Sequence, residues 1–218
     1  YMLSRFLGLS NKVESILACA ILLITIGVLV NQANTIQIVA NTSESTSQLT
    51  GEYGLRTSIS YIGIFTVVVA CLVGIFICLY SGEYLSRDPR YLLYYPLVLL
   101  LIAGILGMFY SADLFLVFLS AELTTITASG LTAFRFNQEA AIKAGFKYLI
   151  MNSLGTLIML LGVYFAFRST GSVSFSQISD ANGTALSIGA GCIIVGFAIK
   201  AGVVPLHTWV PEVYTNAP

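Results

Sequence analysis

The chain has 218 residues, of which 57% are hydrophobic and 9% charged, and its ten basic residues balance ten acidic ones. Soluble domains carry about 25% charged residues, so this composition excludes an ordinary soluble protein and indicates a membrane protein. The zero net charge also argues against a nucleic-acid partner, which would require a basic patch.

Six apolar segments follow one another, and most approach or exceed the ~20 residues that a helix needs to span a bilayer. They cover residues 13–30, 59–80, 94–109, 114–134, 144–167 and 185–204. We therefore expect an all-α, polytopic transmembrane helix bundle that forms one domain over residues 1–218. Because Pro205 and Pro211 follow the sixth segment, its helix is expected to be discontinuous.

Basic residues between these segments predict the orientation of the bundle. If residues 1–12 are cytoplasmic, the outer connections contain only Arg56 and Arg168. The inner connections contain seven basic residues: Arg5, Lys12, Arg87, Arg90, Arg135, Lys143 and Lys147. Positive charge collects on the cytoplasmic side of membrane proteins, so we expect the N-terminus of this sequence on that side.

The cysteines lie inside apolar segments and form no C-x-x-C pair, at positions Cys19, Cys71, Cys78 and Cys192. We expect them to pack as small apolar side chains rather than to form disulfides or a metal site. One histidine cannot build a zinc or haem site, and no haem, flavin or iron–sulfur ligand pattern is present. The sequence therefore predicts no cofactor and no bound metal.

Glu122 is a carboxylate inside the fourth apolar segment. It lies nine residues after Asp113, or about 13 Å along a helix that Asp113 is expected to cap. A carboxylate at that depth must be protonated, paired or hydrated. Hydroxyl side chains that follow it can hold water or satisfy backbone groups: Thr124, Thr125, Thr127 and Ser129. The alternative role for Glu122 is a static salt bridge between helices.

Lys200 ends the sixth apolar segment. Apolar surroundings favour the neutral amine, whereas an approaching carboxylate favours the charged form, so a movable Glu122–Lys200 pair would act as a proton switch. The alternative is that Lys200 extends to the nearer membrane surface. His207 is either a proton relay or a loop histidine without a transport role. Trp209 belongs either to the interfacial belt or to the helix break.

Lys147 begins the fifth segment together with Lys143, one helical turn earlier. From charge counting we expect both to anchor the cytoplasmic end of that segment. A transport role for Lys147 is the alternative.

Four stretches make the sequence resemble the antiporter-like membrane subunits of respiratory complex I, of multisubunit sodium/proton antiporters and of membrane-bound energy-converting hydrogenases. They are Leu79–Tyr84, Asp113–Glu122, Ala140–Tyr148 and Lys200–Pro218. The last is the most specific, because it is close to the family's K-x-x-x-x-P-x-H-x-W-x-P-[DE] signature. Ala121 departs from the family, which often has tryptophan before the glutamate.

The resemblance implies roles for four residues. Glu122 matches the intramembrane glutamate and Lys200 the lysine at the discontinuous helix, where the glutamate controls proton release by the lysine. Lys147 matches the lysine that opens the intervening helix, and His207 matches the histidine of the motif. A hydrated polar axis then passes protons along the membrane plane.

Family members contain two inverted helical repeats. By comparison this sequence corresponds to a fragment with about the second to the seventh helix, and it has a partial antiporter-like fold.

The hypothesis is therefore a proton (or sodium) translocating subunit of a redox-driven respiratory or energy-converting complex, either NADH:quinone oxidoreductase-like or hydrogenase-like. It would carry no redox centre and would contact other integral membrane subunits, lipid, and protons or sodium ions. The membrane would be a prokaryotic cell membrane, or a mitochondrial or plastid inner membrane.

Two other classes stay open. A stand-alone secondary transporter would bind the carboxylate of a small organic substrate at Lys200. A passive scaffold would only anchor other subunits.

Overall fold

The structure is a computed structural model of the chain. It describes residues 11–40, 49–50, 56–57, 61–85, 91–135, 137–179 and 181–217. The basic residues Arg5, Arg87 and Arg90, the expected cytoplasmic N-terminal residues 1–10, most of the connection 41–60, and Pro218 lie outside the described residues.

Helices dominate the described part of the chain, which confirms the predicted all-α class. The exception is a pair of two-residue antiparallel strands, β1 (Leu49–Thr50) and β2 (Arg56–Thr57). The chain divides into two compact units, Tyr1–Tyr110 and Ser111–Pro218.

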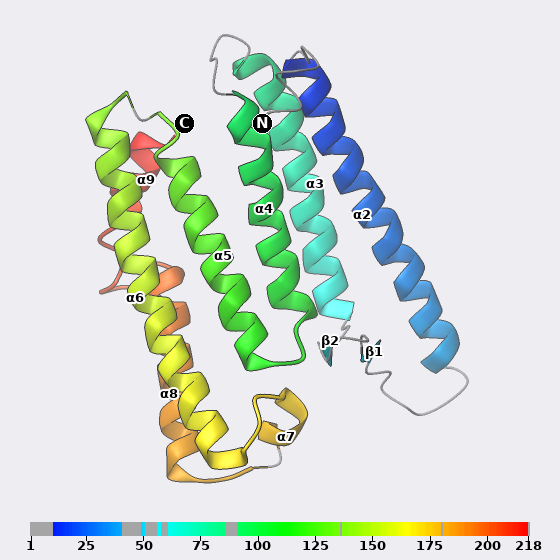
Figure 1. Cartoon of the computed structure of the whole chain (residues 1–218), viewed down its shortest axis with the longest axis vertical. Coiled ribbons are helices and arrows are strands. Elements are labelled where there is room, and N and C mark those ends of the chain that lie inside the picture. The colour runs from blue at the N-terminus through cyan, green and yellow to red at the C-terminus, as the bar shows by residue number, and fades with distance from the viewer. Residues whose placement is uncertain are drawn as a thin grey trace. The chain divides into compact units, whose positions relative to one another are not determined.

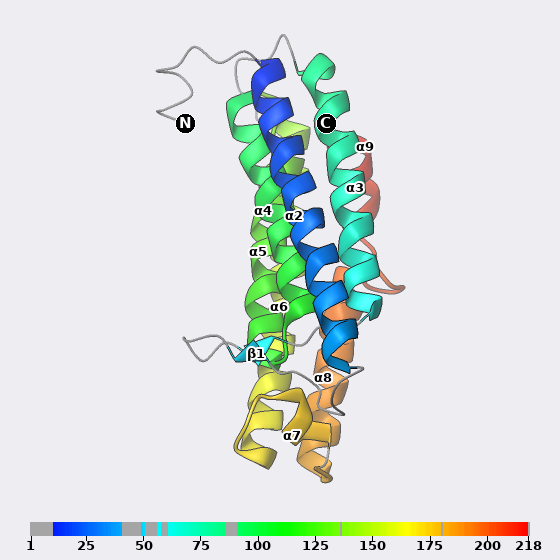
Figure 2. The ribbon, with the colours of Figure 1, turned by 90° about the vertical axis from the view of Figure 1, so that its right-hand side faces the viewer.

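The first unit contains three long helices: α2 (Asn11–Ala40), α3 (Tyr61–Tyr84) and α4 (Tyr91–Tyr110). Helix α3 packs against both of the others (Figures 1 and 2). The Ser15 hydroxyl donates to the carbonyl of Cys78 at 2.6 Å, which joins α2 to α3. Helix α2 continues ten residues beyond the apolar segment that predicted it, and this extension includes polar residues.

All four cysteines are free, and three of them are buried. Cys71 and Cys78 are fully inaccessible to solvent within the first unit. The interpretation of the cysteines as apolar packing residues is confirmed.

The second unit is built around α6. Helix α6 contacts α5, α7, α8 and α9, and its most extensive contact is with α8 (Figure 1). The helices of this unit are α5 (Leu114–Thr132), α6 (Glu139–Thr170), α7 (Phe175–Ser179), α8 (Thr184–Lys200) and α9 (Val210–Asn216).

Main-chain pairing fixes the start of α5. The amide of Leu114 donates to Val173 O at 2.9 Å, and the amide of Phe175 donates to Ala112 O at 3.0 Å. Asp113 occupies the N-cap position, but its side chain makes no capping hydrogen bond. The N-cap position predicted for Asp113 is therefore confirmed, whereas its carboxylate does not form the capping hydrogen bond.

Two pairs of glycines let α6 and α8 approach closely, in antiparallel directions. A methyl group added to Gly196 would lie 2.6 Å from Gly155 O, and one added to Gly162 would lie 2.6 Å from Gly189 O. Both helices repeat the glycine after seven residues, which is close to two helical turns. Contacts at these distances leave no room for a side chain at the glycine positions, so the two backbones meet directly there.

The expected helix break follows directly after α8. The amide of Gly202 donates to Ile199 O at 3.1 Å and that of Val203 to Ala198 O at 3.0 Å. With Gly202 at φ 65°, this pattern is a Schellman motif, which ends a helix by satisfying its last carbonyls. The chain resumes as α9 only at Val210. The predicted discontinuous last helix is confirmed, although α8 ends at Lys200 rather than at residue 204.

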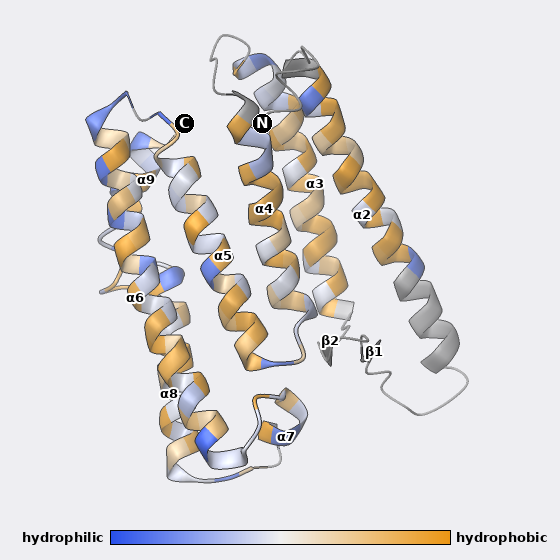
Figure 3. Ribbon diagram, in the orientation of Figure 1, coloured by the Kyte–Doolittle hydropathy of each residue, from blue (hydrophilic) through white to orange (hydrophobic). Residues whose placement is uncertain are grey.

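Five described helices are long and apolar enough to cross a membrane: α2, α3, α4, α5 and α6. Helix α8 is apolar but has only 17 residues. Such a helix is about 25 Å long, shorter than the ~30 Å hydrocarbon layer. Hydrophobic positions predominate along these helices where their residues are described (Figure 3).

The glycine contact between α6 and α8 is testable by adding one methyl group. We expect Gly196→Ala to make the protein about 1–3 kcal/mol less stable than Gly191→Ala, because the added group would overpack the interface. Gly191 lies in the same helix and has no atom within 4 Å of its added methyl group. Thermal unfolding of the purified protein in detergent measures the difference, and equal midpoints for the two variants would contradict the close packing.

Candidate functional site

Three helices of the second unit bring Glu122 and Lys200 to the same level. The glycine pairs set a register between α6 and α8 that places Lys200 opposite Met151, twelve residues into α6. That is about 18 Å from the start of α6. Glu122 on α5 reaches the same part of α6, where it contacts Ser153 and Thr156. Both charged residues therefore lie near the midpoint of the longest helix.

The carboxylate of Glu122 faces α6. Its Oε2 accepts a hydrogen bond from the Thr156 hydroxyl, and its Oε1 accepts one from the Ser153 hydroxyl at 3.4 Å. Thr156 is 1% exposed, and Glu122 itself is partly buried. The hydroxyls are one turn apart on α6, so a single face of that helix supplies both donors.

The ammonium group of Lys200 faces α5. Its Nζ donates to Ala121 O at 2.9 Å and to the hydroxyl of Thr125. Thr125 is fully buried, and its own hydroxyl lies 3.0 Å from Ala121 O. Lys200, the last residue of α8, thus binds a neighbouring helix with its ammonium group.

No salt bridge joins Glu122 to Lys200 among the described residues, where the ion pairs involve other residues. The two groups are nonetheless neighbours, because the carbonyl that binds Lys200 belongs to the residue before Glu122. Among the described residues, Glu122 therefore does not form the static salt bridge that was the alternative role. Neutral dipoles satisfy both charged groups.

The other hydroxyls of α5 return to its own backbone. Thr124 donates to Ala121 O at 2.7 Å, Thr127 to Leu123 O at 2.7 Å, and Ser129 to Ile126 O at 2.8 Å. Of the two roles expected for these residues, the structure shows the satisfaction of backbone groups.

Lys147 takes part in a second polar contact, which holds α9 against α6. Its ammonium group forms an ion pair with Glu212, and the two side chains are 37% and 49% exposed. Beside this pair, the rings of Tyr148 and Trp209 meet edge to face with centroids 5.0 Å apart. Trp209 is 7% exposed, and its indole donates to Ile199 O at 3.2 Å. Trp209 therefore packs in the helix break.

His207 and Lys143 lie apart from these contacts. His207 is exposed in the turn after α8, and its ring makes no hydrogen bond with any other described residue. Lys143 pairs with Glu139 one turn earlier on α6 at 3.5 Å, and both side chains are largely exposed.

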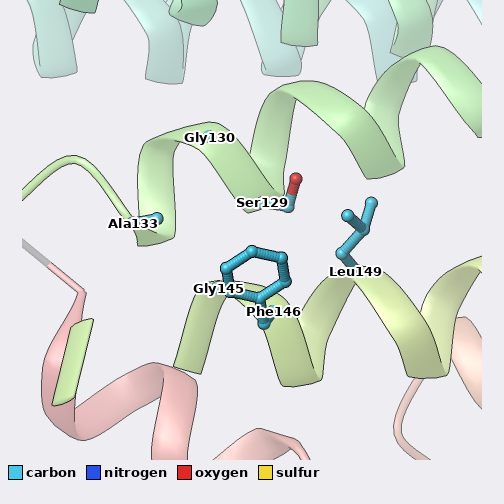
Figure 4. Close-up of a pocket in the computed structure, with 6 residues that line it drawn as sticks. All are labelled: Ser129, Gly130, Ala133, Gly145, Phe146 and Leu149. Atoms are coloured by element: carbon cyan, nitrogen blue, oxygen red, sulfur yellow. The ribbon is translucent and has the colours of Figure 1, made fainter. Parts of the chain in front are cut away.

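A cavity of about 160 Å³ lies between the end of α5 and the start of α6 (Figure 4). It is lined by Ser129, Gly130, Ala133, Gly145, Phe146 and Leu149. Neither Glu122 nor Lys200 lines it, so the cavity is separate from the charged site. In the described part of the chain, no three His, Cys, Asp or Glu side chains come together in a way that could hold a metal ion.

Sequence reasoning did not identify three contact residues: Ser153 and Thr156 as donors to Glu122, and Glu212 as the partner of Lys147. A signal for the first two was present. Asn152, Ser153 and Thr156 interrupt an apolar helix at spacings of three and four, which places a polar stripe on one side. Nothing in the local sequence pointed to the pairing of Glu212.

The fold is that of antiporter-like membrane subunits. It matches the membrane-bound sulfane sulfur reductase, an archaeal respiratory membrane complex, with a TM-score of 0.75 at 23% identity over 95% of this chain and 46% of that one. It also matches the Mrp complex from Dietzia sp. DQ12-45-1b, with a TM-score of 0.76 at 21% identity over 99% of this chain and 41% of that one. The predicted partial antiporter-like fold is confirmed.

The sequence identifies the family. Residues 111–218 match the family described as "NADH:quinone oxidoreductase/Mrp antiporter, TM". NADH-quinone oxidoreductase subunit N of Hydrogenovibrio crunogenus is 32% identical over 159 residues, 70% of this chain and 33% of that protein. The same-named subunit of Alkalilimnicola ehrlichii is 31% identical over 195 residues, 85% of this chain and 39% of that protein.

The chain belongs to this family of antiporter-like membrane subunits, as the resemblance indicated, and it is a multi-pass integral membrane protein. It spans about a third of the length of the curated relatives that it matches. The matched family region coincides with the second unit, which contains Glu122, Lys147, Lys200 and His207.

The Lys147–Glu212 ion pair should stabilise the docking of α9. In a double-mutant cycle with Lys147→Met and Glu212→Gln, we expect a coupling of about 0.2–1 kcal/mol, the range for partly exposed pairs. Hydrogen exchange of the α9 amides measures the opening of this segment. The matched control is Lys143→Met with Glu139→Gln, whose more exposed pair should leave α9 unchanged. Equal effects of both cycles on α9 would contradict the conclusion that the Lys147–Glu212 pair holds this helix.

Proposed function

We propose that this chain is the part of an antiporter-like subunit that moves protons, or sodium ions, through the membrane domain of a multisubunit respiratory or energy-converting complex. Glu122 and Lys200 would be the groups that carry the translocated charge. The relatives named as NADH-quinone oxidoreductase subunit N support this proposal.

The observation that carries the proposal is the placement of two opposite charges, one from α5 and one from α8, beside the middle of α6. Ionisable groups inside a membrane cost several kcal/mol, and they are found where they line an ion or proton pathway or pair with one another. In this chain the charges are neighbours without an ion pair. A role in structure alone would favour direct pairing.

The mechanism follows from the two hydrogen-bond sets. When the carboxylate of Glu122 moves toward Lys200, its charge stabilises the ammonium group and favours proton uptake by the lysine. When the carboxylate turns back to the α6 hydroxyls, that support is lost and the proton is released more easily. A conformational change elsewhere in the complex can drive transport if it alters the position of either side chain.

Lys147 and His207 are proposed as further stations of a proton path. Lys147 lies two turns before Ser153 on α6, on the same helix that binds Glu122. His207 is exposed within the helix break that follows Lys200. Imidazole exchanges protons near neutral pH, so His207 could pass protons between Lys200 and groups beyond this chain.

Translocation should fail in variants that keep the charge of the site but block proton release. Guanidinium stays protonated in proteins, so Lys200→Arg should reduce redox-coupled pumping at least about tenfold, since a positioned proton-transfer group contributes roughly 10²–10⁴-fold. Glu122→Gln should reduce it as well. Both are measured with the full-length chain in its complex, reconstituted in vesicles with a pH-sensitive dye.

The control for these variants is Lys143→Gln, which removes an exposed lysine of α6 and should pump normally. Near-normal pumping in both Lys200→Arg and Glu122→Gln would rule out the proposed ion carriers. It would favour a passive scaffold.

The orientation of α6 is a second proposal that can be tested. The basic residues around the start of α6 predict that this end is cytoplasmic. In cells, an impermeant maleimide should label Gln177→Cys from outside, and label Asn137→Cys only after permeabilisation. Both positions are exposed, beyond opposite ends of α6. The protein without added cysteines serves as the control for labelling of the four native ones. Labelling of Asn137→Cys from outside, and of Gln177→Cys only after permeabilisation, would show the opposite orientation.

A further inference from the structure

The charged groups of Glu122 and Lys200 are each bound by a threonine hydroxyl on a helix other than their own. Thr156 on α6 donates to Glu122, and Thr125 on α5 accepts from Lys200. These threonines are 1% and 0% exposed, so water does not compete directly at either side chain. The sequence indicated only a general hydrogen-bonding role for Thr125 and no role for Thr156.

Thr156 has more than one acceptor for its single proton. Its Oγ1 lies 2.9 Å from Ser153 O and 3.4 Å from Asn152 O, in addition to its contact with Glu122. A hydroxyl donates only one hydrogen bond at a time. Thr156 can therefore release the carboxylate and donate to its own helix, without leaving a buried polar group unsatisfied.

Thr125 has the complementary arrangement. Its hydroxyl can donate to Ala121 O at 3.0 Å, which turns the oxygen lone pairs toward the Lys200 ammonium group. If Lys200 loses its proton, the neutral amine can accept a hydrogen bond, and a rotation of the Thr125 hydroxyl would supply it. The same side chain thus fits both protonation states of the lysine.

Thr125 lies close to Glu122 on α5, so only a small movement is needed for Lys200 to exchange Thr125 for Glu122 as its partner. Thr125 follows Glu122 by three residues, so both side chains are on the same side of α5. Lys200 already contacts that side through Thr125 and Ala121. A movement of the carboxylate away from Thr156, toward the lysine, is all that an ion pair requires.

We propose that Thr125 and Thr156 are positioning residues that hold Lys200 and Glu122 apart, and that the two hydroxyls set the balance between the separated charges and a direct ion pair. This inference rests on the proposed function, because it assigns control of the Glu122–Lys200 switch. Loss of either hydroxyl shifts the balance toward the ion pair. The lysine then keeps its proton, and transport slows although the fold is retained.

The test is infrared difference spectroscopy of the full-length chain in its assembled complex. The bands of Glu122 are first identified as those lost in Glu122→Gln. We expect Thr156→Val to shift these bands, because the carboxyl group loses its main donor, and to slow pumping several-fold. Thr156→Ser restores the hydroxyl and should restore both the band position and the rate.

Thr127→Val is the matched control. Thr127 is 3% exposed, and its hydroxyl contacts only the backbone of α5, so the variant removes a buried hydroxyl without touching either charge. It should leave the Glu122 bands in place. If Thr156→Val does not assemble, Thr156→Cys keeps a side chain of similar size with a weaker donor and should shift the bands in the same direction.

Two results would overturn the inference: unshifted Glu122 bands in the hydroxyl-deficient Thr156 variant, or an equal shift in Thr127→Val. The spectroscopic result does not depend on transport. If the bands shift as expected while Glu122→Gln pumps normally, the positioning role stands and the proposed function fails. If Glu122→Gln stops pumping while Thr156→Val neither shifts the bands nor slows transport, the positioning role alone fails.

Discussion

Backbone contact between α6 and α8 determines where Lys200 lies in the second unit. At two levels, seven residues apart, glycine faces glycine, and an added methyl group would meet a carbonyl oxygen at 2.6 Å. This contact fixes the register of the two helices, and Lys200 follows Gly196 by one helical turn. A bulkier interface would move the lysine away from α5, and its bonds to Ala121 and Thr125 would be lost. The close helix contact is therefore a condition for the site.

Neutral dipoles, rather than an opposite charge, satisfy Glu122 and Lys200. Removing one partner of a buried ion pair typically costs 3–5 kcal/mol, so a direct pair in this apolar unit would resist separation. A hydrogen bond to a charged group contributes about 1.5–3 kcal/mol, and both threonines have other acceptors nearby. The separated arrangement is thus held weakly enough to exchange. That property is what the proposed role of Glu122 and Lys200 as proton carriers requires.

The segment after the helix break is fixed by contacts that differ in kind. A Schellman motif at Gly202 satisfies the last carbonyls of α8, the indole of Trp209 gives one of them, Ile199 O, a second hydrogen bond, and the Lys147–Glu212 pair attaches α9 to α6. Irregular backbone at membrane depth is tolerated only where its polar groups find protein or water partners. The family signature in this segment corresponds in part to such partners: Trp209 to the carbonyl and Glu212 to the lysine.

The sequence by itself determined the class of the protein, the helical segments, the helix break and the two charged residues within apolar segments, because each depends on composition or on residues close together in the chain. Proline and glycine after Lys200 set the break locally, and the motif around His207 and Trp209 indicated the family. The donors to Glu122 could not be assigned, because Thr156 is 34 residues away and its side is chosen by how α5 and α6 pack. The main-chain pairing at the start of α5 could not be predicted for the same reason: its partners lie in the segment beyond α6. Only the tertiary structure decided that the two charges stay apart, since hydroxyls brought in by packing compete with the ion pair that their proximity favours.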